Sequence, residues 1–207
     1  MTELAKALRD LDEKKVHELV AKRIAEGASY ADIIKECTEG FIAVGELFES
    51  KEYYLTELMF SAEIMKGVMD KLEPLAGSAA GMEPVGTVVI GTVKGDIHDI
   101  GKNIVVSFLR GNGFEVVDLG VDVPAEKFVK AVKETGTKIL GLSALLNTTY
   151  PEMKNVVEAL KEEGLRDQVK VIIGGAICSE KVRQFTGADY YATDVVTGVK
   201  ICKSIYE

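Results

Sequence analysis

Residues 85–103 read VGTVVIGTVKGDIHDIGKN, an apolar run rich in β-branched residues that leads into a charged loop. Four more apolar runs follow, and segments with apolar residues at helical spacing separate them. The five runs lie at 85–93, 114–120, 137–144, 169–175 and 188–193. The helical segments lie near 101–111, 124–135, 150–163, 179–186 and 194–205. Strands that alternate with helices and are apolar nearly throughout are typical of a parallel sheet covered on both faces. The pattern therefore predicts a doubly wound α/β domain with five parallel strands.

The first 75 residues carry a helical pattern throughout. Their apolar residues recur at three- and four-residue spacing, Gly27 predicts a helix end, and Ser29 predicts a helix start. Four helices with short connections are typical of a small bundle. The stretch at 74–84, PLAGSAAGMEP, has little charge and many small residues, as linkers do. We therefore expect a helical cap domain at 1–75, a linker at 76–84 and an α/β domain at 85–207.

The composition excludes several classes of protein. The chain has 207 residues with 25 basic and 33 acidic side chains, which gives a net charge of −8. A negative surface disfavours nucleic acids and anionic membranes as partners. No apolar run approaches the roughly 18 residues of a membrane span, and the N-terminus carries charges where a signal peptide is apolar. We therefore expect a cytoplasmic protein with no nucleic-acid and no membrane partner.

Cysteine and histidine are scarce in the chain. Three cysteines lie far apart without a CxxC pair, so the sequence predicts neither a disulfide framework nor a zinc site, and we expect the cysteines to be buried fillers. The two histidines are His17 and His98. His17 lies among charged residues and is expected on a solvated helix face, which leaves His98 as the candidate for imidazole chemistry.

Three loops of the predicted sheet contain the unusual residues. In an open parallel sheet, ligands bind beyond the carboxyl ends of the strands. The loops in question follow the first, third and fourth strands, at 94–103, 143–149 and 174–176. They would bring acidic and imidazole groups, hydroxyl groups and a glycine pair to one crevice.

The first loop does not match a phosphate-binding loop. A Walker motif has four residues between its glycines, followed by Lys and Ser or Thr. Here five residues separate Gly95 from Gly101, and Asn103 follows Lys102. The spacing therefore argues against nucleotide hydrolysis, and the absence of GxGxxG from this loop argues against dinucleotide binding.

Three interpretations of His98 stay open on the residues alone. A hydrolytic metal site could use Asp96, His98 and Asp99, although such sites generally have three protein ligands and a second histidine is lacking here. Alternatively, His98 is the single protein ligand of a metal held by a cofactor, with Asp96 fixing its tautomer and a hydroxyl of the third-strand loop bonding to Asp96. In the third interpretation, His98 only caps a helix or lies on a surface loop.

Three short motifs coincide with these loops: DxHxxG at 96–101, SxL at 143–145 and GG at 174–175. They are separated by 41 and 28 residues. In order and spacing they resemble the signature of cobalamin-binding modules. The segments GELFE at 45–49 and EYYLTEL at 52–58 are similar to the helical cap of methionine synthase and of free-standing corrinoid proteins. The resemblance implies a four-helix bundle cap followed by a Rossmann-like, flavodoxin-type sheet of five strands.

The resemblance also implies the roles of individual residues. His98 would be the lower ligand of the cobalt, in place of the cofactor's benzimidazole, and Asp96 would bond to His98. Thr149 stands where methionine synthase has a serine that continues this relay, so the catalytic set would be His98, Asp96 and Thr149. Ser143, Leu145, Gly174 and Gly175 would line the slot for the displaced nucleotide tail, with Asn147 where threonine is expected, and Phe48 and Leu55 would cover the methyl face. The full cofactor-binding set is Gly95, Asp96, Ile97, His98, Asp99, Gly101, Ser143, Leu145, Asn147, Thr149, Gly174, Gly175, Thr193, Phe48 and Leu55.

The implied function is that of a corrinoid methyl carrier rather than a stand-alone enzyme. Its cobalt would cycle between Co(I) and methyl-Co(III) while the chain shuttles between a substrate-specific methyltransferase and a second one that passes the methyl group to a pterin or thiol. A reductive activase is a further expected partner, and the cap would move about the linker at 76–84. A cobalamin-dependent sensor, or the small subunit of an adenosylcobalamin mutase, is the alternative.

Several other residues have ordinary structural interpretations. Apolar residues on helical stripes, such as Met59, Met65 and Met69, are expected in the bundle core. Lys102 is expected on the surface of its helix, and Asp99 is expected to be exposed and to help cap the helix that begins near Gly101.

Overall fold

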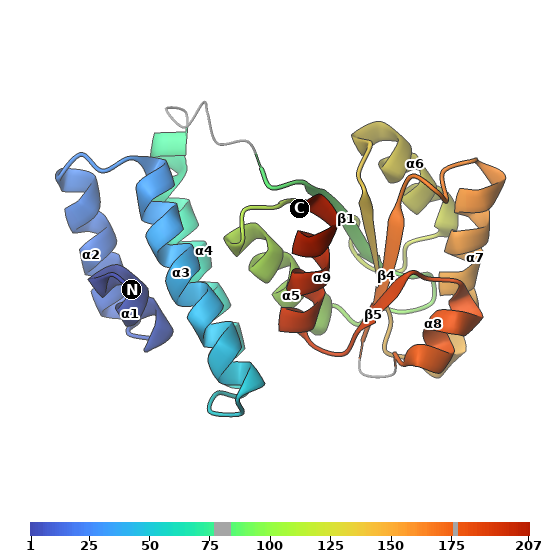
Figure 1. Ribbon diagram of the computed structural model, residues 1–207, viewed down its shortest axis with the longest axis horizontal. Coiled ribbons are helices and arrows are strands. Elements are labelled where there is room, and N and C mark those ends of the chain that lie inside the picture. The colour runs from blue at the N-terminus through green and yellow to red at the C-terminus, as the bar shows by residue number, and fades with distance from the viewer. Residues whose placement is uncertain (77–83, 176–177) are drawn as a thin grey trace. The chain divides into compact units, whose positions relative to one another are not determined.

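Nine α-helices and five β-strands make up residues 1–76, 84–175 and 178–207, the part of the chain that the computed structural model describes (Figure 1). The chain divides into two compact units, Met1–Glu83 and Pro84–Glu207. The predicted linker at 76–84 lies almost wholly outside the described residues. Within the described ranges, no helix is both long and apolar enough to cross a lipid bilayer.

The first unit consists of the four predicted helices. They are α1 (Glu3–Arg9), α2 (Glu13–Ala25), α3 (Tyr30–Glu49) and α4 (Leu55–Ala76). Side-chain oxygens of Thr2, Asp12 and Ser29 accept backbone N–H groups at the starts of the first three helices, where such donors have no partner within the helix. Gly27 follows α2 with a φ of +78°, a conformation in which glycine is not strained. The predicted helix start at Ser29 is confirmed.

The helical unit confirms the predicted burial of one methionine and corrects two other expectations. Met65 is buried in it. Met59 is exposed instead, so its prediction as a core residue was wrong. His17 is not solvated as expected: its ring packs against Gly67 of α4, where a Cβ would lie 3.0 Å from the ring. Its Nδ1 is buried without a hydrogen-bond partner among the described residues.

The second unit is the predicted parallel sheet. Its strands are β1 (Thr87–Thr92), β2 (Glu115–Asp118), β3 (Ile139–Ser143), β4 (Lys170–Gly174) and β5 (Tyr190–Ala192). The helices are α5 (Ile100–Gly111), α6 (Ala125–Thr135), α7 (Tyr150–Glu162), α8 (Glu180–Thr186) and α9 (Val195–Tyr206), with a 3₁₀ turn η1 (Asn147–Thr149) before α7. The strand order is β2-β1-β3-β4-β5 with all pairs parallel, which is the flavodoxin-type order.

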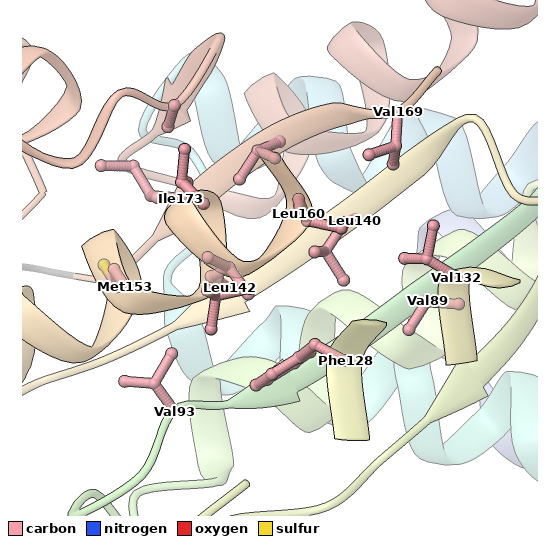
Figure 2. Close-up of a cluster of buried hydrophobic side chains, with 14 of the residues drawn as sticks. Val89, Val93, Phe128, Val132, Leu140, Leu142, Met153, Leu160, Val169 and Ile173 are labelled. Carbon is pink, nitrogen blue, oxygen red and sulfur yellow. The ribbon is translucent and has the colours of Figure 1, made fainter. Parts of the chain in front are cut away.

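Helices cover both faces of this sheet (Figure 1). On one face, α6, α7 and α8 pack on the strands through a cluster of buried apolar side chains. Figure 2 shows part of this cluster, in which Phe128 and Leu160 of the helices join Val89, Leu140 and Ile173 of the strands. The helices α5 and α9 lie on the opposite face (Figure 1). Because both faces are covered, the apolar runs of the strands need no polar side, as the sequence pattern indicated.

The cysteines are buried as expected. Burial raises the pKa of the Cys37 and Cys202 thiols to about 12 and that of Cys178 to about 11. These thiols therefore stay protonated at neutral pH, and a protonated thiol is a poor nucleophile and a poor metal ligand.

Candidate functional site

The carboxyl edge of the sheet brings the predicted loops together. Thr92, Ser143, Gly174 and Ala192 are Cα partners from strand to strand and form one row across β1, β3, β4 and β5. The loops after these strands therefore start side by side. The chain reverses its strand order between β1 and β3, and such a switch point is where open α/β sheets bind ligands.

Asp96 and His98 form the centre of this edge. The Asp96 Oδ1 accepts the backbone N–H of His98 at 2.9 Å and lies 2.7 Å from the His98 Nδ1. Both contacts stay within the β1–α5 loop, so a two-residue step places the imidazole beside the carboxylate. This is the pairing that the sequence predicted for these two residues.

The other Asp96 oxygen is held by the β3–α7 loop. Oδ2 accepts the backbone N–H groups of Leu145 and Leu146 at 2.7 and 3.1 Å. The carboxylate is fully buried. Burial by itself raises its pKa, but the hydrogen bonds from His98, Leu145 and Leu146 outweigh burial and lower the pKa to about 2. Asp96 is therefore ionised at neutral pH.

An ionised Asp96 fixes the tautomer of His98. A carboxylate only accepts hydrogen bonds, so the Nδ1 of His98 has to carry the proton of that contact. In the neutral ring, Nε2 then holds the lone pair and is available as a ligand. The His98 side chain is 48% exposed, in contrast to its buried partner. The pair thus presents one oriented nitrogen at the carboxyl edge of the sheet.

Neighbouring loops fix the backbone around this pair. The Asp122 Oδ1 accepts the N–H of Gly95 at 2.7 Å, and the Asp122 N–H donates to the Asp96 carbonyl at 2.9 Å. The hydroxyl of Thr92 donates to the His98 carbonyl at 3.0 Å. Sequence reasoning missed Thr92 and Asp122. A hydroxyl inside an apolar strand run was the available signal for Thr92.

The Thr149 hydroxyl does not bond to Asp96, as a relay through Asp96 and His98 would require. Its hydroxyl donates to the Leu146 carbonyl at 2.8 Å, and its side chain is buried with its methyl group near Gly95. The third-strand loop therefore reaches Asp96 through two backbone N–H groups rather than through the expected hydroxyl. Backbone donors leave no mark in a sequence, which is why this arrangement was not predicted.

The motif glycines differ in whether packing within the protein requires a glycine at that position. Gly175 has a φ of +129°, and a Cβ there would lie 2.0 Å from the Ala144 carbonyl oxygen, so packing requires a glycine. Chain neighbours aside, the nearest described atom to a Cβ at Gly174 would be 3.8 Å away, and a Cβ at Gly101 would have no described atom beyond its own helix within 4 Å. Because packing within the protein does not require these two glycines, they fit a surface that another molecule approaches closely.

Exposed apolar side chains lie in the loops that meet at the Asp96–His98 pair. Ile97 and Ile100 flank His98 in the chain and are 75% and 64% exposed. Leu145, Leu146 and Val121 are also exposed, and the hydrogen bonds to Asp96 and from Asp122 hold their loops beside the pair. Several large exposed apolar residues around one polar group are typical of a ligand-binding site.

The remaining predicted residues lie in accessible places. Asp99 is exposed as expected, but its carboxylate accepts from the Asn103 side chain at 3.1 Å and makes no capping hydrogen bond. Asn147 is exposed in η1, and Thr193 is exposed directly after β5. In the helical unit, Phe48 is half-buried and Leu55 is 52% exposed.

Lys102 contradicts its prediction as a surface lysine. Its side chain is buried, and its Nζ lies 2.6 Å from the Asp118 Oδ2 and 2.8 Å from the Asn103 Oδ1. The first turn of α5 is thereby tied to the end of β2. The sequence shows the charge but not its partner, 16 residues further along the chain, so the ion pair was missed.

The geometry does not provide the three ligands of a hydrolytic metal site. Among residues 1–76, 84–175 and 178–207, no group of three or more His, Cys, Asp and Glu side chains is placed to hold a metal ion. Both oxygens of Asp96 are already engaged, Oδ1 by His98 and Oδ2 by the backbone of the β3–α7 loop. What remains is a single oriented imidazole with apolar surroundings.

Comparison with known proteins shows the family to which the chain belongs. The chain matches two family models, both described as a B12 binding domain, at residues 1–73 and 86–200. The chain belongs to the B12-binding corrinoid proteins of methyltransferase systems. A trimethylamine corrinoid protein of Methanosarcina acetivorans is 42% identical over 94% of this chain and 92% of its own.

Solved structures of corrinoid proteins have the same fold as this chain. A cobalamin-binding protein from Desulfitobacterium hafniense has a TM-score of 0.82 and 43% identity over 99% of both chains. The methanol:cobalamin methyltransferase complex of Methanosarcina barkeri has a TM-score of 0.84 and 32% identity over 98% of this chain and 78% of the other. The cofactor is therefore a corrinoid, and the residues at the carboxyl edge fit one. They include the oriented Nε2 of His98, two glycines that packing does not require, Gly101 and Gly174, and exposed apolar side chains in the neighbouring loops.

Proposed function

We propose that this corrinoid protein is a methyl carrier that binds cobalamin with its own base displaced and with the Nε2 of His98 as the lower cobalt ligand. The 2.7 Å contact between His98 Nδ1 and a buried, ionised Asp96 is the observation that carries the proposal. It leaves Nε2 as the nitrogen that can bind a metal. A bound corrinoid would supply a cobalt that accepts and gives up a methyl group.

The chain's own residues would bind and orient the cofactor. Asp96 holds the imidazole in one tautomer, as partners of metal-bound histidines generally do. Ser143, Gly174 and Gly175 would line the slot for the nucleotide tail. Leu145 would line this slot as well, and exposed apolar residues such as Ile97 would help to keep water from the metal.

The protonation of His98 would depend on whether its Nε2 binds the cobalt. An Nε2 that is not bound to a metal would have its lone pair free for a proton, because metal and proton compete for one nitrogen. Asp96 would stabilise the resulting imidazolium through the contact already present. Thr149 would support the Asp96–His98 pair indirectly: its hydroxyl bonds to the Leu146 carbonyl in the β3–α7 loop and not to Asp96.

The carrier would serve at least two partners. One is a substrate:corrinoid methyltransferase for methanol or a methylamine, since relatives of this chain are corrinoid proteins of trimethylamine and of methanol systems. A second methyltransferase would pass the methyl group to a pterin or thiol, and a reductive activase would restore oxidised cobalt.

Methyl transfer between purified components tests the proposal. The corrinoid-loaded chain, reduced to the cobalt(I) state, is mixed with a candidate substrate methyltransferase and methanol or a methylamine. We expect the cobalt(I) absorption band to disappear only when donor and methyltransferase are both present. A chain that retains an adenosyl group and forms an organic radical would instead be a mutase subunit, and the proposal would be wrong.

A further inference from the structure

Thr92 is a buried hydroxyl at the end of a strand that is otherwise apolar. It is the last residue of β1 and has no exposed surface. A valine would have nearly the same shape without a polar atom, and a buried hydroxyl is costly unless it is hydrogen-bonded. The bond that satisfies it does not go to a neighbouring strand. It goes to the backbone carbonyl of His98, six residues further along the chain, at 3.0 Å.

The backbone of Thr92 is itself held firmly. Its N–H donates to the Gly120 carbonyl at 2.9 Å, and its carbonyl accepts the N–H of Val123 at 3.0 Å. The hydroxyl therefore connects His98 to a fixed point in the sheet. Because Asp96 already holds the N–H and the Nδ1 of His98, the residue is restrained at three of its atoms.

We propose that Thr92 is a positioning residue for the metal-binding imidazole: its hydroxyl fixes the His98 peptide so that Nε2 is aimed at the cofactor. This inference rests on the proposed function. Asp96 alone sets the tautomer and the ring angle, but it leaves the carbonyl side of His98 free to turn. A hydrogen bond to that carbonyl removes this freedom before the cofactor binds, and preorganisation of this kind raises the fraction of protein that is competent to coordinate.

The test compares hydroxyl-deleting and hydroxyl-keeping variants of the corrinoid-loaded protein. The variants are Thr92→Val, Thr92→Ala and Thr92→Ser. The protein is labelled with ¹⁵N-histidine and its cofactor is reduced to cobalt(II), so that electron paramagnetic resonance shows a ¹⁵N doublet when a histidine is bound and no such doublet when it is not. We expect the ratio of His-off to His-on cofactor to rise about tenfold in Thr92→Val and Thr92→Ala, the size of one lost buried hydrogen bond. Thr92→Ser keeps the hydroxyl and should stay near the wild-type ratio.

A matched control separates positioning from general stability. Thr137 is another buried threonine, and its hydroxyl donates to the Thr87 and Ile139 carbonyls at the amino end of the sheet. Thr137→Val should lower the melting temperature but leave the ¹⁵N doublet unchanged. If Thr92→Val and Thr92→Ala also keep the wild-type ratio, or if Thr92→Ser loses it, Thr92 is not a positioning residue. If wild-type protein itself shows no ¹⁵N doublet, the ligand assignment fails instead, so the two ideas are tested separately.

Discussion

Replacing His98 by alanine is expected to weaken cobalamin binding by at least about 100-fold, because the partners of a metal-bound histidine alone are worth 10- to 100-fold and this change removes the ligand itself. The fold should survive, since the His98 side chain is half exposed at the edge of the sheet. Equilibrium dialysis of the apoprotein against cobalamin measures the change, and circular dichroism checks that the variant is folded.

The second histidine provides the control for this prediction. His17 lies in the helical unit against Gly67 and is the only other imidazole of the chain. His17→Gln should bind cobalamin within about twofold of the wild type, although it can lower the stability of the helical unit. Equal affinity of His98→Ala and wild-type protein would mean that another group supplies the lower ligand.

Replacing Gly175 by alanine is expected to destabilise the α/β unit by about 2–4 kcal/mol. The new Cβ would lie 2.0 Å from the Ala144 carbonyl oxygen, in a backbone conformation with a φ of +129°. The ends of β3 and β4 would have to separate, and the slot between their loops would change shape. Urea denaturation measures the lost stability, and we expect cobalamin binding to fall with it.

The variant Gly174→Ala separates the effect of backbone strain from the effect of blocking the proposed tail slot. A Cβ at Gly174 would have 3.8 Å to the nearest atom, so Gly174→Ala should change the free energy of unfolding by less than about 0.5 kcal/mol. We nevertheless expect it to lower cobalamin affinity at least about tenfold, because in the proposed binding mode the methyl group would occupy space that the nucleotide tail needs. Unchanged affinity in Gly174→Ala would show that the tail does not pass this residue.

Most of the architecture was predictable because it depends on patterns of apolar residues. Strands covered on both faces have to be apolar nearly throughout, and the runs at 85–93 and 137–144 contain β1 and β3. The helical unit was equally clear, including the start of α3 at Ser29. Met59 was misplaced because a helical stripe does not say which side faces the interior when apolar residues also occupy an exposed face.

The sequence predicted those parts of the site that depend on side chains within one loop. It did not predict those that depend on contacts between elements far apart in the sequence. The pairing of Asp96 with His98 follows from two residues in one loop. The second support of Asp96 comes from backbone N–H groups of Leu145 and Leu146, which any residue other than proline supplies. The burial of Lys102 follows from a contact with Asp118, which becomes visible only when α5 and β2 are side by side.

Isotopic labelling of the protein tests the central claim most directly, namely that a histidine of this chain holds the cobalt. The protein is prepared with ¹⁵N-histidine, loaded with unlabelled cobalamin and reduced to cobalt(II). If His98 is the ligand, the nitrogen splitting of the electron paramagnetic resonance lines should change from the triplet of ¹⁴N to the doublet of ¹⁵N. A triplet that persists in the labelled protein would mean that the cofactor's own benzimidazole remains bound, and it would contradict the account.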